Sequence, residues 1–262
     1  MVSRMRRNIM NWKKGLTLVM AVGIAAGVLA GCGSDTSSDK KVLTFGAETT
    51  YPPFEYAEDH TYKGFDVDLS NALAKEMGYE AKFVSLPFDG LIPALQSKQI
   101  DAITSGLVVT KEREAKVNFT EPYYHVKLVM VVRQDTNNVN GESDIAGKTV
   151  GAQIGTTGAM LAQSKQGTTV KEFDAISTML QDLEGGNIQI AMLDEPVAKY
   201  YIQKLNMKDL KIVPVGLQDH TVAIAVRNDD KELLDKMNAA FEKLKANGEY
   251  DKLQQKWFGD IQ

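Results

Sequence analysis

Arg113 is the residue with the most specific recognition chemistry in this sequence. A guanidinium group offers two parallel hydrogen bonds in a fixed fork, which suits a carboxylate. Arg113 lies in the run Lys-Glu-Arg-Glu (111–114), and an arginine in such a run is more often a solvated charge on a helix. The residue type alone therefore leaves two interpretations, a carboxylate clamp and an exposed surface charge.

Three other segments place hydrogen-bonding groups where predicted strands end. Gly-Thr-Thr-Gly (155–158) lies between a strand and a helix, where free backbone N–H groups suit a carboxylate, although Thr156 or Thr157 could also simply cap the helix. Asp194 follows an apolar run and precedes Glu-Pro, which is the pattern of a helix N-cap. Ser105 and Gly106 end another predicted strand and offer hydroxyl and carbonyl acceptors.

The amino-terminal segment has the layout of an export signal. Residues 1–14 carry five basic side chains and no acid, and residues 16–28 are apolar apart from Thr17 and two glycines. This apolar run is shorter than the roughly 20 residues that a spanning helix needs, which favours a signal peptide removed as residues 1–31. Cys32 follows Leu-Ala-Gly and is similar to the lipidated cysteine of a bacterial lipobox. The alternatives are a buried free thiol and an ordinary signal with an incidental cysteine.

Charge and cysteine content exclude several classes of function. Removal of residues 1–31 takes away five positive charges and no acid, so the formal charge moves from −4 to −9. A chain this acidic lacks the clustered lysines and arginines that bind nucleic acid. A single cysteine leaves no internal disulfide and no CxxC zinc or redox site. Residues 32–40 are predicted to be a lipidated flexible tether that holds the protein at the outer face of the cell membrane.

From Lys41 onward, short β-rich runs alternate with amphipathic runs of helical length, which predicts an α/β fold. Strands are predicted over residues 42–47, 81–85, 100–104, 127–132, 149–153, 170–173, 188–193, 211–215 and 221–226. Helices are predicted over residues 66–77, 91–98, 157–166, 176–183, 195–205, 230–247 and 249–258, with a charged helix opening at Thr110. The polar segment 135–142 separates two such series, which indicates two lobes.

Several motifs, in order along the chain, resemble the polar amino-acid family of bacterial solute-binding proteins, the capture subunits of ABC importers. They are Gly-Phe-Asp-Val-Asp-Leu (64–69), Leu-Ile-Pro-Ala-Leu (91–95), Ile-Asp-Ala (100–102), Thr-Lys-Glu-Arg (110–113), Asn-Gly-Glu-Tyr (247–250) and Lys-Trp-Phe (256–258). The match runs from Val42 to Phe258. The resemblance implies a two-lobed periplasmic-binding-protein-like fold, in which each lobe is a mixed sheet flanked by helices. It implies hinge strands at 127–132 and 221–226, a discontinuous first lobe (41–131 and 222–262) and a second lobe (132–221).

The same resemblance assigns roles to residues that would bind the backbone of an amino acid. A free α-amino acid is a zwitterion, so its site must supply donors for the carboxylate and acceptors for the ammonium group. The resemblance implies that Arg113 and the loop of Thr156 and Thr157 meet the carboxylate, and that Asp194 accepts from the ammonium group.

Three residues after the strand 100–104 belong to the same implied site. Ser105 and Gly106 can also accept from the ammonium group. Val108 stands where many relatives carry serine or threonine. The Gly106 carbonyl is therefore expected to take more of this contact.

The resemblance also places a wall around the ligand side chain. Tyr51 and Phe88 occupy the positions of aromatic residues that sandwich the side chain, although Tyr51 lies in a Tyr-Pro-Pro-Phe turn that would bury aromatics anyway. Glu48 occupies a position where relatives with an acid bind the polar end of the side chain, and Gln153 matches another pocket position. This set favours a basic ligand, namely arginine, lysine or histidine, with glutamine next.

The resulting prediction is a monomeric binding protein with an L-amino acid as ligand, an ABC permease as partner, no cofactor, no metal and no catalytic residue. One alternative is a sensory-receptor lobe, which would be followed by a transmembrane helix, whereas this sequence continues for four residues past Phe258. Another alternative is a dehydratase-like enzyme on the same fold.

An enzyme would need a poised acid or base, most readily a histidine. None of the histidines falls on a matched pocket position: they are His60, His125 and His220. The isolated carboxylates are interpreted as solvated or capping groups: they are Asp66, Asp68 and Asp101.

Overall fold

The computed structural model describes residues 41–213 and 217–260. The predicted signal peptide (1–31), the tether (32–40) and Cys32 lie outside these described residues. Within the described ranges, no helix has both the length and the apolar character needed to cross a membrane.

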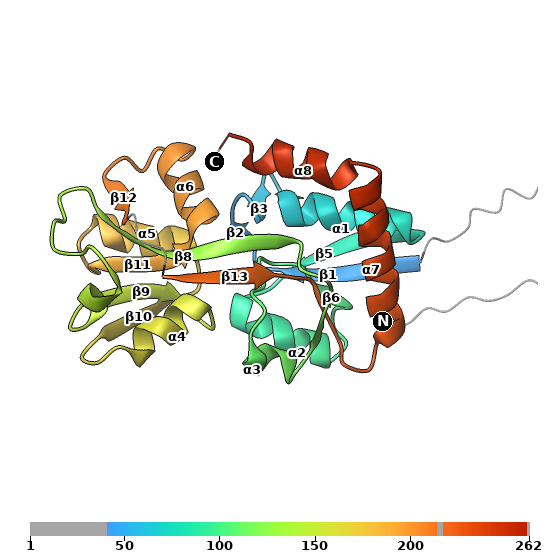
Figure 1. Ribbon diagram of the computed structural model, residues 1–262, viewed down its shortest axis with the longest axis horizontal. Coiled ribbons are helices and arrows are strands. Elements are labelled where there is room, and N and C mark those ends of the chain that lie inside the picture. Colours follow the sequence, from blue (N-terminus) through green and yellow to red (C-terminus); the bar gives the residue numbers. More distant parts are fainter. Residues whose placement is uncertain (1–40, 214–216, 261–262) are drawn as a thin grey trace, which may run out of the picture. The chain divides into compact units, whose positions relative to one another are not determined.

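The first sheet is mixed and has the strand order β5-β1-β6-β14-β7 (Figure 1). β1 (Lys41–Ala47) runs parallel to β5 (Tyr79–Ser85) and β6 (Ala102–Ile103). β14 (Ala225–Val226) runs antiparallel to both β6 and β7 (Asn118–Phe119). The carboxyl ends of β1 and β6 therefore lie at the same edge of the sheet.

Helices cover both faces of the first sheet. Successive side chains of a strand point to opposite faces. Leu43 and Phe45 of β1 pack with α1 (Phe65–Glu76), whereas Gly46 lies against Leu91 of α2 (Leu91–Gln96). α7 (Lys231–Ala246) and α8 (Glu249–Phe258) pack on α1 and on each other.

The second sheet is also mixed, with the order β10-β9-β11-β8-β12 and with β13 also paired to β8. β9 (Thr149–Gln153) runs parallel to β10 (Thr169–Phe173) and β11 (Ile190–Asp194). β8 (Tyr124–Arg133) is antiparallel to β11, β12 (Leu210–Ile212) and β13 (Gln218–Val222).

Helices cover both faces of this sheet too, as alternate residues of β8 show. Met130 and Val132 belong to the same core cluster as Leu161 of α4 (Thr157–Ser164). Val129 and Val131 belong to the cluster that contains α5 (Ile176–Glu184) and α6 (Glu195–Gln203). The predicted fold class, two mixed sheets each flanked by helices, is thus observed.

The predicted hinge strand 127–132 lies within β8, which pairs with β13, and the two lie side by side in Figure 1. β8 is longer than the predicted 127–132. The predicted run 221–226 is wrong as a single strand, because Val222 ends β13 in the second sheet and Ala225 begins β14 in the first. The predicted lobe limits describe which residues move together. Strand pairing does not test such motion, so the lobe limits stay a prediction.

The other differences from prediction concern short elements. An antiparallel sheet of β2 (Thr50–Tyr51), β3 (Glu55–Glu58) and β4 (Thr61–Lys63) was not predicted, because strands this short show little periodicity. β7 and the 3₁₀ turns η1 (Phe88–Gly90) and η2 (Glu142–Ile145) were also missed. The predicted charged helix is observed only as the short α3 (Lys111–Glu114), and the predicted strand 100–104 is shortened to β6. The predicted strand 211–215 corresponds to β12, and residues 214 and 215 lie outside the described residues.

Candidate ligand-binding site

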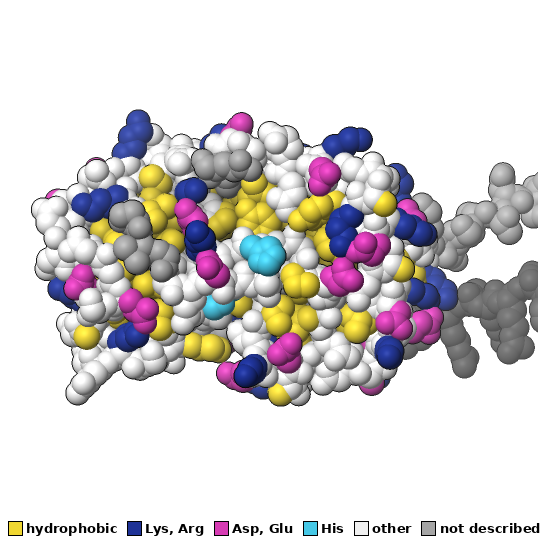
Figure 2. Space-filling view, viewed as in Figure 1, with side chains coloured by type: hydrophobic (Ala, Val, Ile, Leu, Met, Phe, Trp, Pro, Cys, Tyr) yellow, Lys and Arg dark blue, Asp and Glu magenta, His cyan; other side chains and the backbone are white. Residues whose placement is uncertain are grey.

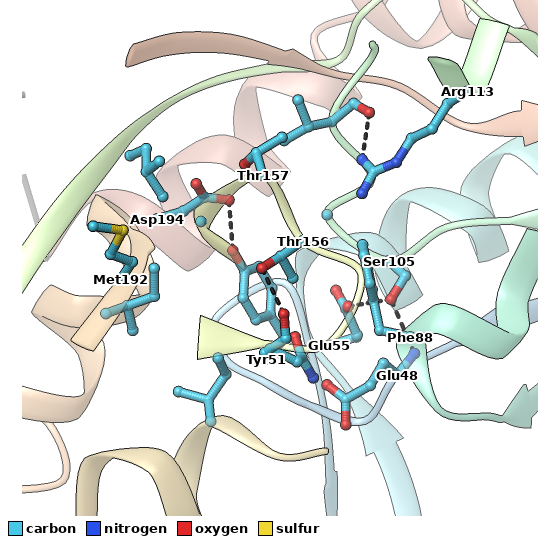
Figure 3. A pocket seen from close by; sticks show the side chains of 17 residues that line it. Glu48, Tyr51, Glu55, Phe88, Ser105, Arg113, Thr156, Thr157, Met192 and Asp194 are labelled. Carbon is cyan, nitrogen blue, oxygen red and sulfur yellow. Dashed lines mark hydrogen bonds between the residues drawn. The ribbon is translucent and has the colours of Figure 1, made fainter. Parts of the chain in front are cut away.

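The carboxyl ends of strands from both sheets surround one cavity (Figure 3). Open α/β sheets commonly bind ligands at this edge. All the residues predicted for the site line this cavity: Glu48, Tyr51, Phe88, Ser105, Gly106, Val108, Arg113, Gln153, Thr156, Thr157 and Asp194. Their roles toward a ligand stay predictions.

Arg113 is buried, although its neighbours in α3 are exposed. Its side chain is 5% exposed, its Nη1 donates to the Val108 carbonyl at 2.6 Å, and its Nη2 donates to the Gly155 carbonyl at 3.0 Å. Burial lowers the pKa of Arg113 to about 10, so the side chain remains cationic at neutral pH. The interpretation as a solvated helix charge is therefore wrong.

Asp194 takes the N-cap position of α6 but makes no side-chain capping hydrogen bond. Its Oδ2 instead accepts from the Tyr51 hydroxyl at 2.5 Å, as Figure 3 shows. Burial raises the pKa of Asp194 to about 6, against smaller lowering effects of the Tyr51 hydrogen bond and the Arg113 charge. The carboxylate thus faces the cavity and is available as an acceptor there.

Glu48 follows β1 and is 7% exposed. Its Oε1 accepts from the Thr50 hydroxyl at 2.9 Å and its Oε2 from the Thr50 N–H at 3.2 Å. Burial raises the pKa of Glu48, and hydrogen bonds from Thr50 and Gln153 oppose the shift. Gln153 is itself held by a hydrogen bond from its Nε2 to the Asp174 carbonyl at 2.8 Å.

The loop after β9 combines capping with a place at the cavity wall. Thr156 caps α4, because its Oγ1 accepts from the Ala159 N–H at 3.3 Å. The same hydroxyl donates to the Gln153 carbonyl at 2.7 Å. The capping interpretation of Thr156 is confirmed. Thr157 is the first residue of α4 and lines the cavity, so its N–H belongs to the positive end of the helix.

Ser105 and Gly106 form the wall beyond β6. The Ser105 Oγ accepts from the Glu48 N–H at 2.9 Å and donates to Glu55 at 2.7 Å. Gly106 has a φ of +52°, and a Cβ there would lie 2.8 Å from the Tyr51 ring. Only glycine fits that position without displacing the ring.

The two aromatic residues have contacts of their own. The guanidinium of Arg113 lies 5.3 Å from the ring centroid of Phe88, a cation–π arrangement. The Tyr51 ring lies under Gly106 and stacks on Phe54, with centroids 5.8 Å apart. Phe88 therefore contacts Arg113 through its ring, whereas Tyr51 contacts Asp194 through its hydroxyl.

Residues 43–260 match the model of a family described as bacterial extracellular solute-binding proteins, family 3. The chain belongs to this family. The arginine-binding extracellular protein ArtP of Bacillus subtilis (strain 168) is 36% identical over 254 residues, which cover 94% of this chain and 98% of ArtP.

Solved structures agree in fold. An ancestral arginine-binding protein bound to arginine is 36% identical, with a TM-score of 0.81 over 84% of this chain and 99% of its own. The ancestral amino-acid-binding protein AncCDT-1, a precursor of cyclohexadienyl dehydratase, is 34% identical, with a TM-score of 0.76 over 83% and 95% of the two chains. These comparisons confirm the predicted two-lobed fold.

Five residues of this solute-binding protein line the cavity without having been predicted: Glu55, Leu128, Ile176, Met192 and Leu193. Gly158 also lines it and lies in the predicted loop 155–158. The apolar ones lie in elements whose hydrophobic pattern indicates only core packing, so no sequence signal separates them from the core. Asp66 was interpreted wrongly as a solvated or capping carboxylate, since it is fully buried. Its place in the motif 64–69 was the available signal.

The cavity lining does not include His60, His125 or His220. Among residues 41–213 and 217–260, no group of His, Cys, Asp and Glu side chains could hold a metal ion. On the face shown in Figure 2, basic and acidic side chains are interspersed rather than gathered by sign.

Proposed function

We propose that this solute-binding protein captures a basic L-amino acid outside the cytoplasm and delivers it to an ABC permease. One observation carries the proposal: a single cavity brings together the buried cation Arg113 and, beside Glu55, the two buried acids Asp194 and Glu48. An amino acid with a cationic side chain carries the three complementary charges. Arginine, lysine and histidine are the preferred ligands, and glutamine comes next.

The backbone of the ligand binds to groups from both sheets. Arg113 donates to the α-carboxylate, together with the N–H groups of Thr156 and Thr157. Asp194 accepts from the ammonium group. The Ser105 hydroxyl and the Gly106 carbonyl are further acceptors, while Val108 adds an apolar contact and the carbonyl that holds Arg113.

The side chain of the ligand lies between Tyr51 and Phe88 and reaches toward Glu48 and Gln153. Lobe 1 (41–131 and 222–262) and lobe 2 (132–221) close over it by rotation at the hinge strands. A few charge-assisted hydrogen bonds of roughly 1.5 to 3 kcal/mol each, less the cost of ordering, can supply the ~8 kcal/mol of micromolar binding. Binding and release require no covalent chemistry, so the protein is not an enzyme.

The amino terminus ties this binding activity to the membrane. Residues 1–31 are removed as a signal peptide, and Cys32 carries the lipid. The tether (32–40) then spans at most about 30 Å when extended. A monomer on this tether stays close to the permease at the outer face of the membrane.

The substitution Glu48→Gln tests the preference for a basic ligand. The neutral amide keeps the shape of the side chain and removes its charge, so L-arginine should bind roughly 10- to 150-fold more weakly. L-Glutamine should lose much less. Calorimetric titration of both ligands measures the difference, with Glu80→Gln at an exposed position of β5 as the control. An equal loss for arginine and glutamine would contradict the proposed preference.

A further inference from the structure

Two buried carboxyl groups lie next to Ser105 and Gly106 in the cavity wall: Glu55 at the start of β3, which also lines the cavity, and Asp66 in α1. Both side chains are 0% exposed. Burial is the largest cause that raises the pKa of both groups, the charge of Asp66 raises the pKa of Glu55 further, and no cation contributes to either shift. Two buried carboxyl groups that interact in this way cannot both hold a negative charge without a large penalty.

The hydrogen-bond partners show which group holds a proton. Asp66 Oδ2 accepts from the Gly106 N–H at 2.8 Å and from the Tyr123 hydroxyl at 2.6 Å, and both bonds favour its ionised form. Glu55 accepts only from the Ser105 hydroxyl. Among the described residues, Glu55 Oε2 and Asp66 Oδ1 are left without a protein partner. A proton on Glu55 Oε2, donated to Asp66 Oδ1, satisfies both atoms.

This pair also fixes the hydrogen-bonding character of the wall. The single hydroxyl proton of Ser105 goes to Glu55, and the N–H of Gly106 goes to Asp66. The Ser105 hydroxyl, through its remaining lone pair, and the Gly106 carbonyl are therefore left as acceptors. An ammonium group needs acceptors and is repelled by donors.

We propose that Glu55 and Asp66 share one proton and act as positioning residues that hold Ser105 and Gly106 as acceptors for the ligand ammonium group. The inference rests on the proposed capture of an amino acid by this cavity. Glu55 does this through Ser105, and Asp66 through Gly106. The charged or titratable groups that face Glu55 are Asp66, Glu48, Tyr51 and Tyr123. The two carboxylates favour the proton on Glu55, and neither tyrosine is a cation that would oppose it.

The first test needs no ligand. A glutamate that is neutral when folded and ionised when unfolded makes folding take up a proton, so stability falls as pH rises above the unfolded pKa of 4.5. Glu55→Gln removes this dependence. The melting temperature of Glu55→Gln, relative to wild type, should therefore rise between pH 5 and pH 8, while Glu80→Gln should follow wild type. A constant or falling difference for Glu55→Gln would overturn the shared proton.

The second test measures L-arginine affinity by calorimetry. Glu55→Gln retains an acceptor for Ser105 and a donor for Asp66, so it should bind within about threefold of wild type. Glu55→Met keeps the volume but not the acceptor, so it should bind at least tenfold more weakly. If Glu55 acts through Ser105, Glu55→Met should cost less than threefold in a Ser105→Ala background.

The outcomes are distinguishable. Wild-type affinity in Glu55→Met, or an additive loss in the double variant, would overturn the positioning role. If Glu55→Met does not fold, two other results can still overturn the inference. One is a constant or falling melting-temperature difference in the pH test, and the other is a tenfold or greater loss of L-arginine affinity in Glu55→Gln. Failure of wild-type protein to bind any basic amino acid would remove the proposed function, whereas the pH test would still report on the shared proton.

Discussion

Asp194→Asn is expected to strengthen folding and to weaken ligand binding at the same time. Asparagine keeps the shape of the side chain and an acceptor oxygen for the Tyr51 hydroxyl, but it removes the buried charge. Burial raises the pKa of Asp194 from 3.8 to about 6, so the folded protein binds this proton more tightly than the unfolded chain. Wild-type stability therefore falls as pH rises from about 4 through about 6, and the loss stays constant above that range.

The magnitude follows from the size of the pKa difference. A difference of about 2 pH units corresponds to roughly 3 kcal/mol at pH 8. For a chain of this size, 1 kcal/mol shifts the melting temperature by roughly 2 to 4 °C, so the variant should melt up to about 6 to 12 °C higher at pH 8. Near pH 4 this gain should vanish. The affinity for L-arginine at pH 8 should fall roughly 10- to 150-fold, because a charge-assisted hydrogen bond is lost.

The assay combines thermal unfolding at pH 4 and pH 8 with calorimetric titration of L-arginine. Asp209→Asn is the matched control, because Asp209 is exposed and lies away from the cavity. If Asp194→Asn is less stable than wild type at pH 8, or gains as much at pH 4 as at pH 8, the argument from burial is refuted. Wild-type affinity in this variant would remove Asp194 from the ammonium site.

Three further predictions concern recognition and anchoring. Arg113→Lys keeps the charge but not the two-donor fork, so L-arginine should bind roughly 10- to 150-fold more weakly by calorimetry with an unchanged circular dichroism spectrum; unchanged affinity would exclude the clamp. Because burial raises the pKa of Asp194 to about 6 and also raises that of Glu48, L-arginine affinity should be full above pH 7 and fall as pH drops through 6, and equal affinities at pH 5 and pH 8 would contradict this. Cys32→Ser should move the protein from the membrane fraction to the soluble fraction with the same affinity for L-arginine, and a variant that stays with the membrane would exclude the lipid anchor.

The positions of the pocket residues could be predicted because most of them follow strands. Glu48, Ser105, Gln153 and Asp194 come at or just after the ends of β1, β6, β9 and β11, and the carboxyl ends of parallel strands meet at one edge. Arg113 needed more than its residue type, since its charged neighbours favour an exposed side chain. The ordered motifs of the family reversed that choice, and its burial agrees with them.

The supporting groups could not be predicted in this way. A glutamate in a two- to four-residue strand looks the same in sequence whether it is buried or exposed, and Glu55 lies in such a strand. Asp66 lies in the first turn of α1, where an acid is expected for capping and dipole reasons alone. Only the three-dimensional packing of β3, α1 and the wall after β6 brings these two carboxyl groups together.

The ionisable groups around the cavity explain why a charged solute suits it better than an apolar one. Burial raises the pKa of Glu48 and Asp194 and lowers that of Arg113, so the charged form of each group comes at a cost to folding. A basic amino acid brings a counter-charge for each of the three groups and offsets this cost. An apolar amino acid supplies counter-charges only to Arg113 and Asp194, through its carboxylate and its ammonium group. It leaves Glu48 buried beside a hydrocarbon group. The burial that weakens the fold therefore also selects the solute, and ligand-induced stabilisation should rank arginine and lysine above glutamine, and glutamine above leucine.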